Sequence, residues 1–295
     1  AVGSGSHVDN LAGGVILNRR WSGVAVSEGR GDEDPSGRET TIDNAGLIRS
    51  EGPGFGVVTD VKGGVTLSNL QGGTIVASEA EGALLRAGTV IVDNAGAIIG
   101  GGSEGGAQIV AGLAAFGDRA AVTNRAGAVI AGDKVGLSLT ATDDASIDNA
   151  GFVSGLIVDG GTSARLANAV TGVVVADEQN GLFGNAVAVD NAGVLQGGVS
   201  ALVLGGDTGR VVNTGTIEGG SGAGIASVTT AGTSVANSGA ITGGVVGIGT
   251  EGGLTLENTG RISGGFVAVK AVGSATVDNR AGGEIVSEGS AIEIV

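Results

Sequence analysis

Two adjacent acid pairs are the residues whose type and spacing could support catalysis. They are Asp143-Asp144 and Asp177-Glu178, and we expect each pair to lie at a corner of the chain. Glycoside hydrolysis requires two carboxylates at a fixed separation on one face. The chain has one Trp, five Phe and no Tyr, so it lacks the aromatic platforms of most sugar clefts, and its one histidine is His7. We therefore expect no catalytic residues, and we interpret the acid pairs as solvated turn carboxylates.

Acidic clusters could also bind a cation. Asp32-Glu33-Asp34 and Asp143-Asp144 carry carboxylate oxygens, the ligands that Ca²⁺ prefers. The nonapeptide phrase of calcium-binding rolls does not occur at the corners, and the chain has no cysteine for a thiolate site. We expect no cofactor, and calcium at Asp143 and Asp144 is the alternative that the sequence leaves open.

A tripeptide in the most polar run of the chain could bind a cell-surface receptor. Arg30-Gly31-Asp32 spells the integrin-binding tripeptide within residues 27–40. Its acidic neighbours fit a plain hydrophilic loop equally well. We retain Arg30, Gly31 and Asp32 as a candidate cell-contact loop.

The charge of the chain excludes one class of partner. Its net charge is −15, so nucleic acid is not expected to bind. Glycine-rich segments lack the Lys-Ser/Thr ending of phosphate-binding loops. The uncharged stretch 219–250 has no continuous apolar run, so we expect no membrane-spanning segment.

The elements that must position these residues are defined by a short repeated phrase. It consists of Val, Ile or Leu, then any residue, then Asn, as in Val211-Val212-Asn213. Successive copies are 19 to 34 residues apart, and a period in this range indicates stacked supersecondary units. The repeated asparagines are Asn10, Asn44, Asn69, Asn94, Asn124, Asn149, Asn168, Asn191, Asn213, Asn237, Asn258 and Asn279.

Each repeat contains three short β-like pieces separated by glycine. The first piece ends at the Asn, the second holds the aliphatic residue after a Gly, and the third follows another Gly, as in 90–94, 96–98 and 136–139. Glycine pairs such as Gly197-Gly198 and Gly243-Gly244 separate the pieces, and we expect them to supply the positive φ angles of sharp corners.

Three strands and three corners make one coil of a solenoid. We therefore predict an all-β fold, a single-stranded parallel β-helix (β-solenoid) of about twelve three-strand coils. One domain is expected over residues 1–295, with a protruding polar loop at 27–40 and a second insertion at 100–119.

The alternation of side chains along a strand predicts which residues face inward. The aliphatic residue and the Asn are two apart, so they share one face, and the residue between them faces out. Buried amides need hydrogen bonds, and identical amides stacked at strand spacing can supply them to one another. We predict an internal ladder of Asn side chains. From Asp43 to Asp190 the outward position alternates between acidic and uncharged residues, which keeps like charges two coils apart.

The repeat resembles the passenger domains of Gram-negative autotransporters and related large repeat adhesins. The phrases that carry the resemblance are Asn44-Ala45-Gly46-Leu47-Ile48, Asn94-Ala95-Gly96-Ala97-Ile98, Asn213-Thr214-Gly215-Thr216-Ile217, Asn237-Ser238-Gly239-Ala240-Ile241 and Asn258-Thr259-Gly260-Arg261-Ile262. The resemblance covers roughly residues 7–295. It implies a right-handed β-helix that is secreted or exposed at a bacterial cell surface.

The last strand predicts self-association. Residues 290–295 are apolar at Ile292, Ile294 and Val295, and open strand edges pair with other strands. The chain is either a slice of a longer passenger or docks end to end into filaments. We expect a non-enzymatic extracellular scaffold, an adhesin stalk or a filament, that contacts host cells, neighbouring cells or polysaccharide. The alternative is a β-helix that binds or cleaves polysaccharide.

Overall fold

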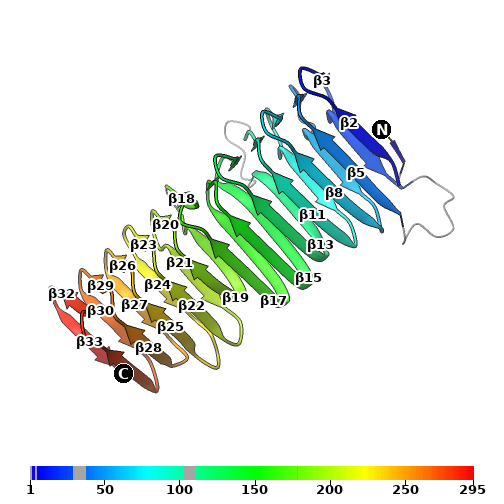
Figure 1. Ribbon diagram of the computed structural model, residues 1–295. Helices are drawn as coiled ribbons and strands as arrows, with labels where there is room; N and C mark the ends of the chain where they lie inside the picture. Colours follow the sequence, from blue (N-terminus) through cyan, green and yellow to red (C-terminus); the bar gives the residue numbers. More distant parts are fainter. Residues whose placement is uncertain (1, 4, 29–37, 103–109, 178) are drawn as a thin grey trace. The chain divides into compact units, whose positions relative to one another are not determined.

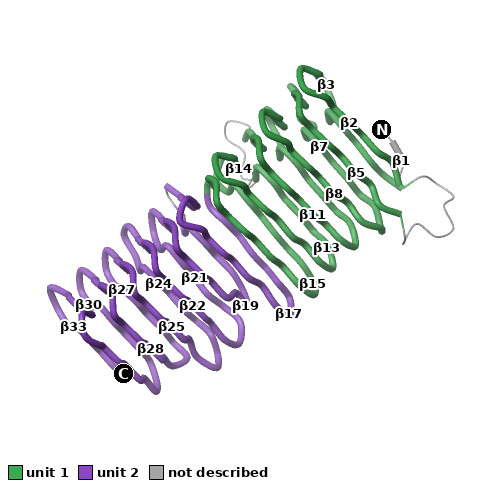
Figure 2. Tube along the Cα trace, in the orientation of Figure 1, with its two compact units in different colours: residues 1–154 green, residues 155–295 purple. Residues whose placement is uncertain are grey.

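The chain forms two compact units, residues 1–154 and residues 155–295 (Figure 2). The computed structural model describes residues 2–3, 5–28, 38–102, 110–177 and 179–295. Within these residues the secondary structure is all β, and every strand pairing is parallel. Each unit is a β-solenoid, so the predicted fold class is confirmed.

Unit 1 contains three parallel ladders of strands, and each coil contributes one strand to each ladder (Figure 1). The Asn-strand ladder consists of β2 (His7–Asn10), β5 (Glu39–Asn44), β8 (Gly64–Asn69), β11 (Thr89–Asn94) and the second halves of β13 (Ala111–Asn124) and β15 (Val135–Asn149). The second-strand ladder consists of β3 (Val15–Asn18), β6 (Leu47–Ser50), β9 (Thr74–Ala77), β12 (Ala97–Ile99), β14 (Val129–Ala131) and β16 (Phe152–Val153). The third-strand ladder consists of β1 (Val2–Gly3), β4 (Val24–Ser27), β7 (Val57–Asp60), β10 (Ala83–Arg86) and the first halves of β13 and β15.

Unit 2 repeats the same three ladders. Its Asn-strand ladder consists of the second halves of β17 (Leu156–Asn168) and β19 (Leu182–Asn191), then β22 (Gly209–Asn213), β25 (Thr233–Asn237), β28 (Leu254–Asn258) and β31 (Ala275–Asn279). Its second-strand ladder consists of β18 (Val173–Ala176), β20 (Val194–Gly197), β23 (Thr216–Gly219), β26 (Ala240–Gly243), β29 (Arg261–Gly264) and β32 (Glu284–Ser287). Its third-strand ladder consists of the first halves of β17 and β19, then β21 (Leu202–Gly205), β24 (Ala223–Ser227), β27 (Val246–Thr250), β30 (Val267–Ala271) and β33 (Ser290–Ile294).

The number of turns is slightly smaller than expected. The described residues make about 11 turns of solenoid, against the predicted twelve coils. The reason is that the twelve repeated asparagines delimit only eleven intervals. Within each unit adjacent turns keep their register, so a ladder Asn lies beside the Asn of the next coil, as Asn69 lies beside Asn94.

The core of each unit is a set of aliphatic columns. The residue two places before the Asn is fully buried in most coils, as at Ile42, Leu67 and Leu256. The residue between it and the Asn is half-buried or exposed in every coil, as at Asp93 and Thr123. The predicted inward and outward faces are therefore confirmed.

The corner expected at Asp143-Asp144 is a correction to the sequence prediction. These residues lie inside β15, which continues from the third strand of one coil into the Asn strand of the next. A register shift opposite Gly117 and Arg119 replaces a break in the strand. A β-bulge of this kind bends the chain without ending its pairing.

The glycine pairs do not all act as predicted. Gly206 and Gly253 have positive φ angles of 89° and 101°, as expected for one member of a corner pair. Neither Gly197-Gly198 nor Gly243-Gly244 has a positive φ. Instead, a Cβ on Gly243 would overlap the carbonyl oxygen of Val246. Glycine is required at these corners because two backbone segments pass too close for a side chain.

The two predicted insertions are only partly described. Residues 29–37, which include the Arg30-Gly31-Asp32 tripeptide, lie outside the described residues, and so do residues 103–109. The expected second insertion at 100–119 was too long, because residues 111–119 belong to β13 and continue both strand ladders.

Candidate functional site

The asparagine ladder is the most regular polar arrangement in each unit. Within each unit, the side-chain Nδ2 of every ladder Asn except the last donates a 2.8 Å hydrogen bond to the Oδ1 of the ladder Asn in the next coil. In unit 1 these bonds join Asn10, Asn44, Asn69, Asn94, Asn124 and Asn149. In unit 2 they join Asn168, Asn191, Asn213, Asn237, Asn258 and Asn279.

Backbone carbonyls complete the hydrogen bonding of the buried amides. Asn94 Nδ2 also donates to the carbonyl oxygen of Val129 at 3.1 Å, and Asn191 Nδ2 makes the same bond to Thr216. The ladder residues from Asn10 to Asn258 are at most 5% exposed, so these bonds compensate for the loss of water. Asn279 is exposed, because no described coil follows β31 in its ladder.

A column of glycines explains the Gly in the repeated phrase. A Cβ on Gly215 would overlap the carbonyl oxygen of Gly193, and a Cβ on Gly239 would overlap that of Gly215. The same relation joins Gly260 to Gly239. Glycine in the Asn-x-Gly phrase therefore allows these short turns to stack directly on the turn before, which brings the amides within hydrogen-bond distance.

The predicted acidic pairs do not come together in a described site. Asp143 and Asp144 are exposed on β15 in unit 1, and Asp144 lies beside Arg119 of the neighbouring strand. Asp177 is exposed after β18 in unit 2, while Glu178 lies outside the described residues. Among the described residues, no group of three or more His, Asp or Glu side chains is arranged to hold a metal ion.

The predicted end-docking strand is β33. Ile292 is 43% exposed, Ile294 is 56% exposed and Val295 is 67% exposed. The strand pairs with β30, and Val295 N donates to the carbonyl oxygen of Ala271. Whether this strand pairs with a second copy stays a prediction.

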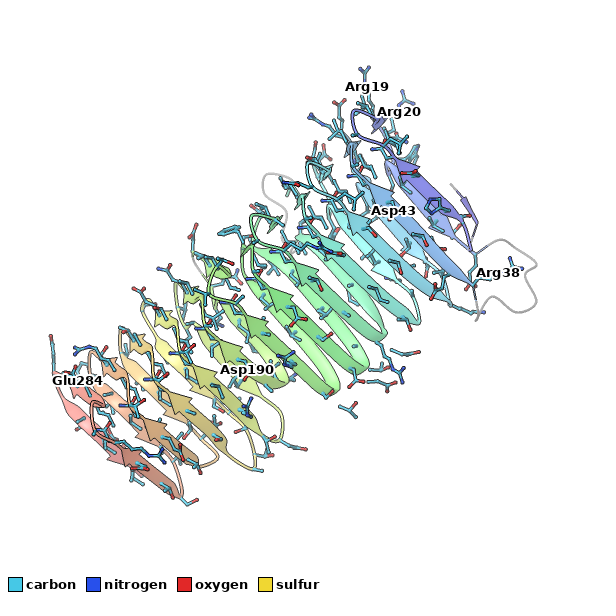
Figure 3. All side chains as sticks on the ribbon, viewed as in Figure 1. Arg19, Arg20, Arg38, Asp43, Asp190 and Glu284 are labelled. Atoms are coloured by element: carbon cyan, nitrogen blue, oxygen red, sulfur yellow. The ribbon has the colours of Figure 1, made fainter. Side chains whose placement is uncertain are left out.

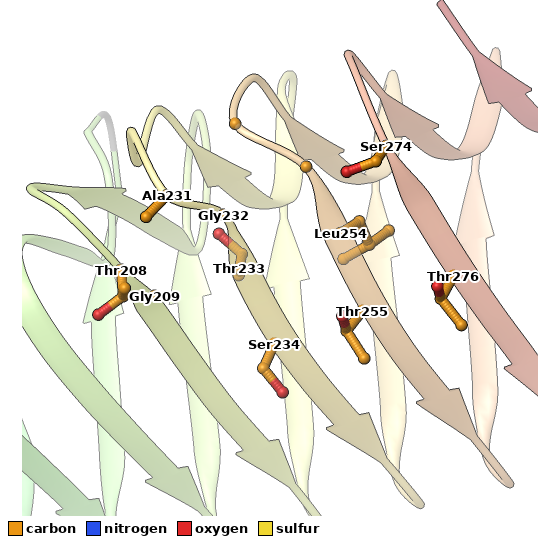
Figure 4. Close-up of a pocket in the computed structure, with 12 residues that line it drawn as sticks. Thr208, Gly209, Ala231, Gly232, Thr233, Ser234, Leu254, Thr255, Ser274 and Thr276 are labelled. Atoms are coloured by element: carbon orange, nitrogen blue, oxygen red, sulfur yellow. The ribbon is translucent and has the colours of Figure 1, made fainter.

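An open groove in unit 2 is lined mainly by hydroxyl groups and glycines (Figure 4). Its volume is about 300 Å³. Ser234, Thr255 and Thr276 form a row along its floor from the adjacent strands β25, β28 and β31. The row offers uncharged donors and acceptors but no carboxylate or base, so it is suited to weak polar contacts.

A larger groove in unit 1 contains an ion pair. Its volume is about 430 Å³, and it is lined by Asn69, Leu70, Gln71, Asp93, Ala95, Arg125 and Ala126. Arg125 Nε donates to Asp93 Oδ1 at 2.6 Å, and Arg125 Nη2 donates to Asp93 Oδ2. The hydrogen bond to Asp93, and then the charge of that carboxylate, raise the pKa of Arg125. We name this cavity the Asp93 groove.

Other charged side chains pair across neighbouring coils. Asp190 accepts from Arg210 at 2.8 Å and lies 3.6 Å from Arg165, so one carboxylate is held between two guanidinium groups. In unit 1, Arg19 and Arg49 lie 3.5 Å and 3.6 Å from the two carboxylate oxygens of Glu51. Such exposed pairs add little stability, but they fix the pattern of surface charge.

The one tryptophan of the chain is displayed on a hydrogen-bonded turn. Asn18 Oδ1 accepts from the backbone N–H groups of Arg20 and Trp21 at 3.0 Å and 3.1 Å. Trp21 is 72% exposed, and Figure 3 shows Arg19 and Arg20 pointing away from the strands. This turn presents an aromatic ring beside two positive charges.

Comparisons with known proteins give this chain no family. No protein family, curated protein or solved structure matches it. Within the described residues, the structure has no helix of the length and hydropathy needed to cross a membrane.

The Asp93 groove was missed at the level of the sequence. The signal that would have found it is the distance from each ladder Asn to the next inward aliphatic residue. This distance is six residues from Asn69 to Ile75 but four from Asn94 to Ile98. The two spacings alternate from coil to coil in unit 1, and this alternation marks where a long turn flanks a short one.

Proposed function

We propose that the chain is a non-enzymatic extracellular scaffold at a bacterial cell surface, acting as an adhesive stalk or assembling end to end into filaments. The asparagine ladder is the observation that carries this proposal. Its hydrogen bonds pass from coil to coil through the interior of each unit, so each turn is fixed to the next. A stack held in this way resists bending and local opening.

The surface and the resemblance support the same role. The net charge of −15 keeps copies of a β-rich chain soluble and apart along their sides. The Asn-x-Gly phrase resembles that of secreted passenger domains, which supports an extracellular location.

Electron microscopy of the purified chain tests end-to-end assembly. We expect filaments from the unmodified chain and single particles from Ile294→Asp, because a carboxylate in β33 opposes strand pairing. Val170→Asp is the matched control, since Val170 is 80% exposed but lies in a turn. Filaments from Ile294→Asp would show that β33 is not the docking strand.

A cell-binding assay tests the adhesive role. Fluorescently labelled chain should bind to bacterial or host cells above the level of an unrelated protein of equal charge. Single particles that bind no cells would contradict the scaffold proposal as a whole.

Polysaccharide binding or cleavage is the second candidate function, and the Asp93 groove favours binding. Cleavage is tested by measuring release of reducing ends from acidic polysaccharides. Activity that is lost in the double variant Asp143→Asn/Asp144→Asn would support a hydrolase or lyase. An inactive unmodified chain would exclude cleavage of the polysaccharides tested.

A further inference from the structure

The turn after the ladder Asn has two lengths in unit 1, and they alternate from coil to coil. The turn is long after Asn10, Asn69 and Asn124 and short after the asparagines of the coils between them. The long turns contain Gly13, Gly72 and Gly127, whose φ angles are 78°, 84° and 78°. A Cβ on any of these three glycines would meet nothing within 4 Å, so the long turns project from the stack.

The long turns are closed by backbone hydrogen bonds, although they project. Gly73 N donates to the carbonyl oxygen of Leu70 at 2.8 Å, and Ala128 N donates to that of Arg125 at 3.0 Å. Each bond closes a four-residue turn with a positive-φ glycine at its third position, the pattern of a type II turn. Two projecting turns that flank a short turn form the walls of a groove.

The Asp93 groove lies between the long turns 70–73 and 125–128, beside the short turn that contains Ala95. Neighbouring coils are about 4.8 Å apart, so these walls are about 9.6 Å apart. The volume of about 430 Å³ falls within the usual range of small-molecule sites, roughly 300–1,000 Å³.

The charged side chains of the Asp93 groove have a net charge of zero, and its polar groups can form further hydrogen bonds. A guanidinium has five N–H donors, and the parallel bonds to Asp93 use two of those of Arg125. The side chains of Arg125 and Asp93 are 61% and 37% exposed. Gln71 adds an amide that both donates and accepts, and it is exposed. A ligand therefore meets donors and acceptors close together.

The remaining wall is apolar. Leu70 is 48% exposed, and Ala95 and Ala126 are small, so they leave room for a flat group. A pyranose ring matches this combination, because its hydroxyl groups donate and accept at its edge while its C–H groups form an apolar face. A charged ligand would gain little electrostatic attraction, because the charges of Asp93 and Arg125 neutralise each other.

We propose that the Asp93 groove binds a neutral sugar residue, with Arg125, Asp93 and Gln71 hydrogen-bonding its hydroxyl groups and Leu70 packing against its C–H face. This inference rests on the proposed adhesive function and names the chemistry of the surface that the scaffold contacts. It assigns no covalent step to the groove.

The test is titration calorimetry of the full chain with linear neutral oligosaccharides of glucose, mannose and galactose. Oligogalacturonate and chitosan oligosaccharides are the charged comparators. We expect at least one neutral series to bind, with at least tenfold weaker affinity in Gln71→Ala and in Arg125→Ala. Arg125→Lys should also weaken binding, because an ammonium cannot reproduce the parallel bonds of a guanidinium.

Arg280→Ala is the matched control. Arg280 also follows a ladder Asn in a long turn, and it lies 3.1 Å from Glu257 and 2.7 Å from Asp278. The cavity beside it is only about 170 Å³. This variant should bind as the unmodified chain does, and circular dichroism should show that every variant remains folded.

Two results would overturn the inference. One is that no neutral series binds, and the other is that binding is unchanged in both Gln71→Ala and Arg125→Ala. Cell binding that persists in variants that have lost sugar binding would show that the groove is not the cell-contact surface, and the scaffold proposal would stand. If the unmodified chain neither binds cells nor forms filaments, the scaffold proposal itself is wrong.

Discussion

The ladder asparagine is a residue whose role depends on identical residues in the coils before and after it. Asn94 accepts from Asn69 and donates to Asn124, each at 2.8 Å. The amide in this position accepts from one coil and has two N–H donors for the next Asn and a backbone carbonyl, whereas a Ser hydroxyl has one donor hydrogen, ionised Asp has none and Leu has neither donor nor acceptor. Repetition of the residue is therefore a physical requirement of the ladder.

Replacement of an interior ladder residue should be far more costly than replacement of the exposed one. Asn94→Ala removes the bonds to Asn69, Asn124 and Val129 and leaves Asn124 Oδ1 without its donor, whereas Asn69 Nδ2 keeps backbone carbonyl acceptors. We expect the free energy of unfolding to fall by about 3 kcal/mol, as for several buried groups left unpaired. Asn279→Ala should lower it by less than about 1 kcal/mol, because water replaces its partners.

Urea denaturation followed by circular dichroism measures both effects. The midpoint for Asn94→Ala should lie clearly below that for Asn279→Ala. Equal midpoints for the two variants would show that the internal hydrogen bonds do not determine stability.

The turns that follow the ladder asparagines are of two kinds, short and long. Short turns such as that of Gly96 stack directly on the coil before, whereas long turns such as that of Gly72 project into open space. Glycine is present in both, but for different reasons. In the short turn, glycine is needed because there is no room for a Cβ. In the long turn, glycine is needed because the backbone has a positive φ angle.

Two alanine substitutions separate these reasons. A Cβ on Gly96 would overlap the carbonyl oxygen of Gly73, so we expect Gly96→Ala to destabilise unit 1 by about 3 kcal/mol or more. Gly72 has a φ of 84° and open space around it, so Gly72→Ala should cost about 1–2 kcal/mol. Thermal unfolding of the two variants checks the order, and a larger loss for Gly72→Ala would contradict this account.

The sequence predicted those features that one coil, or the exact repetition of one coil, determines. The alternation around Ile42 and Asn44 shows which side chains face inward, because a strand has a period of two. It did not predict that Asp143 and Asp144 lie within one continuous strand, nor that Gly243 lacks a positive φ. These features depend on contact between neighbouring coils, and so does the Asp93 groove.

At the scale of the molecule, each coil contacts mainly the coils beside it. Asn94 and Asn124 share a hydrogen bond, whereas Asn94 lies in unit 1 and Asn237 lies in unit 2. In such an architecture, stability is close to a sum of local terms. Coupling between substitutions should therefore be confined to neighbouring coils.

A pair of double variants tests this locality. Asn94→Ala combined with Asn237→Ala should lower the unfolding free energy by the sum of the single effects, within about 0.5 kcal/mol. Asn94→Ala combined with Asn124→Ala should depart from the sum by about 1 kcal/mol or more, because both remove the same bond. Denaturant titrations of the single and double variants give the coupling energies, and non-additivity for the distant pair would indicate long-range cooperativity.

The direction of the amide bonds gives the solenoid a chemical polarity. Within each unit every Asn–Asn bond runs from the Nδ2 of one coil to the Oδ1 of the following coil, so the side-chain dipoles of that unit align. A second copy can continue such a column only in the same direction. A two-fold pairing of identical edges would place two NH₂ groups, or two carbonyl oxygens, against each other. Any fibre that extends the column must therefore be polar, with ends that differ in chemistry.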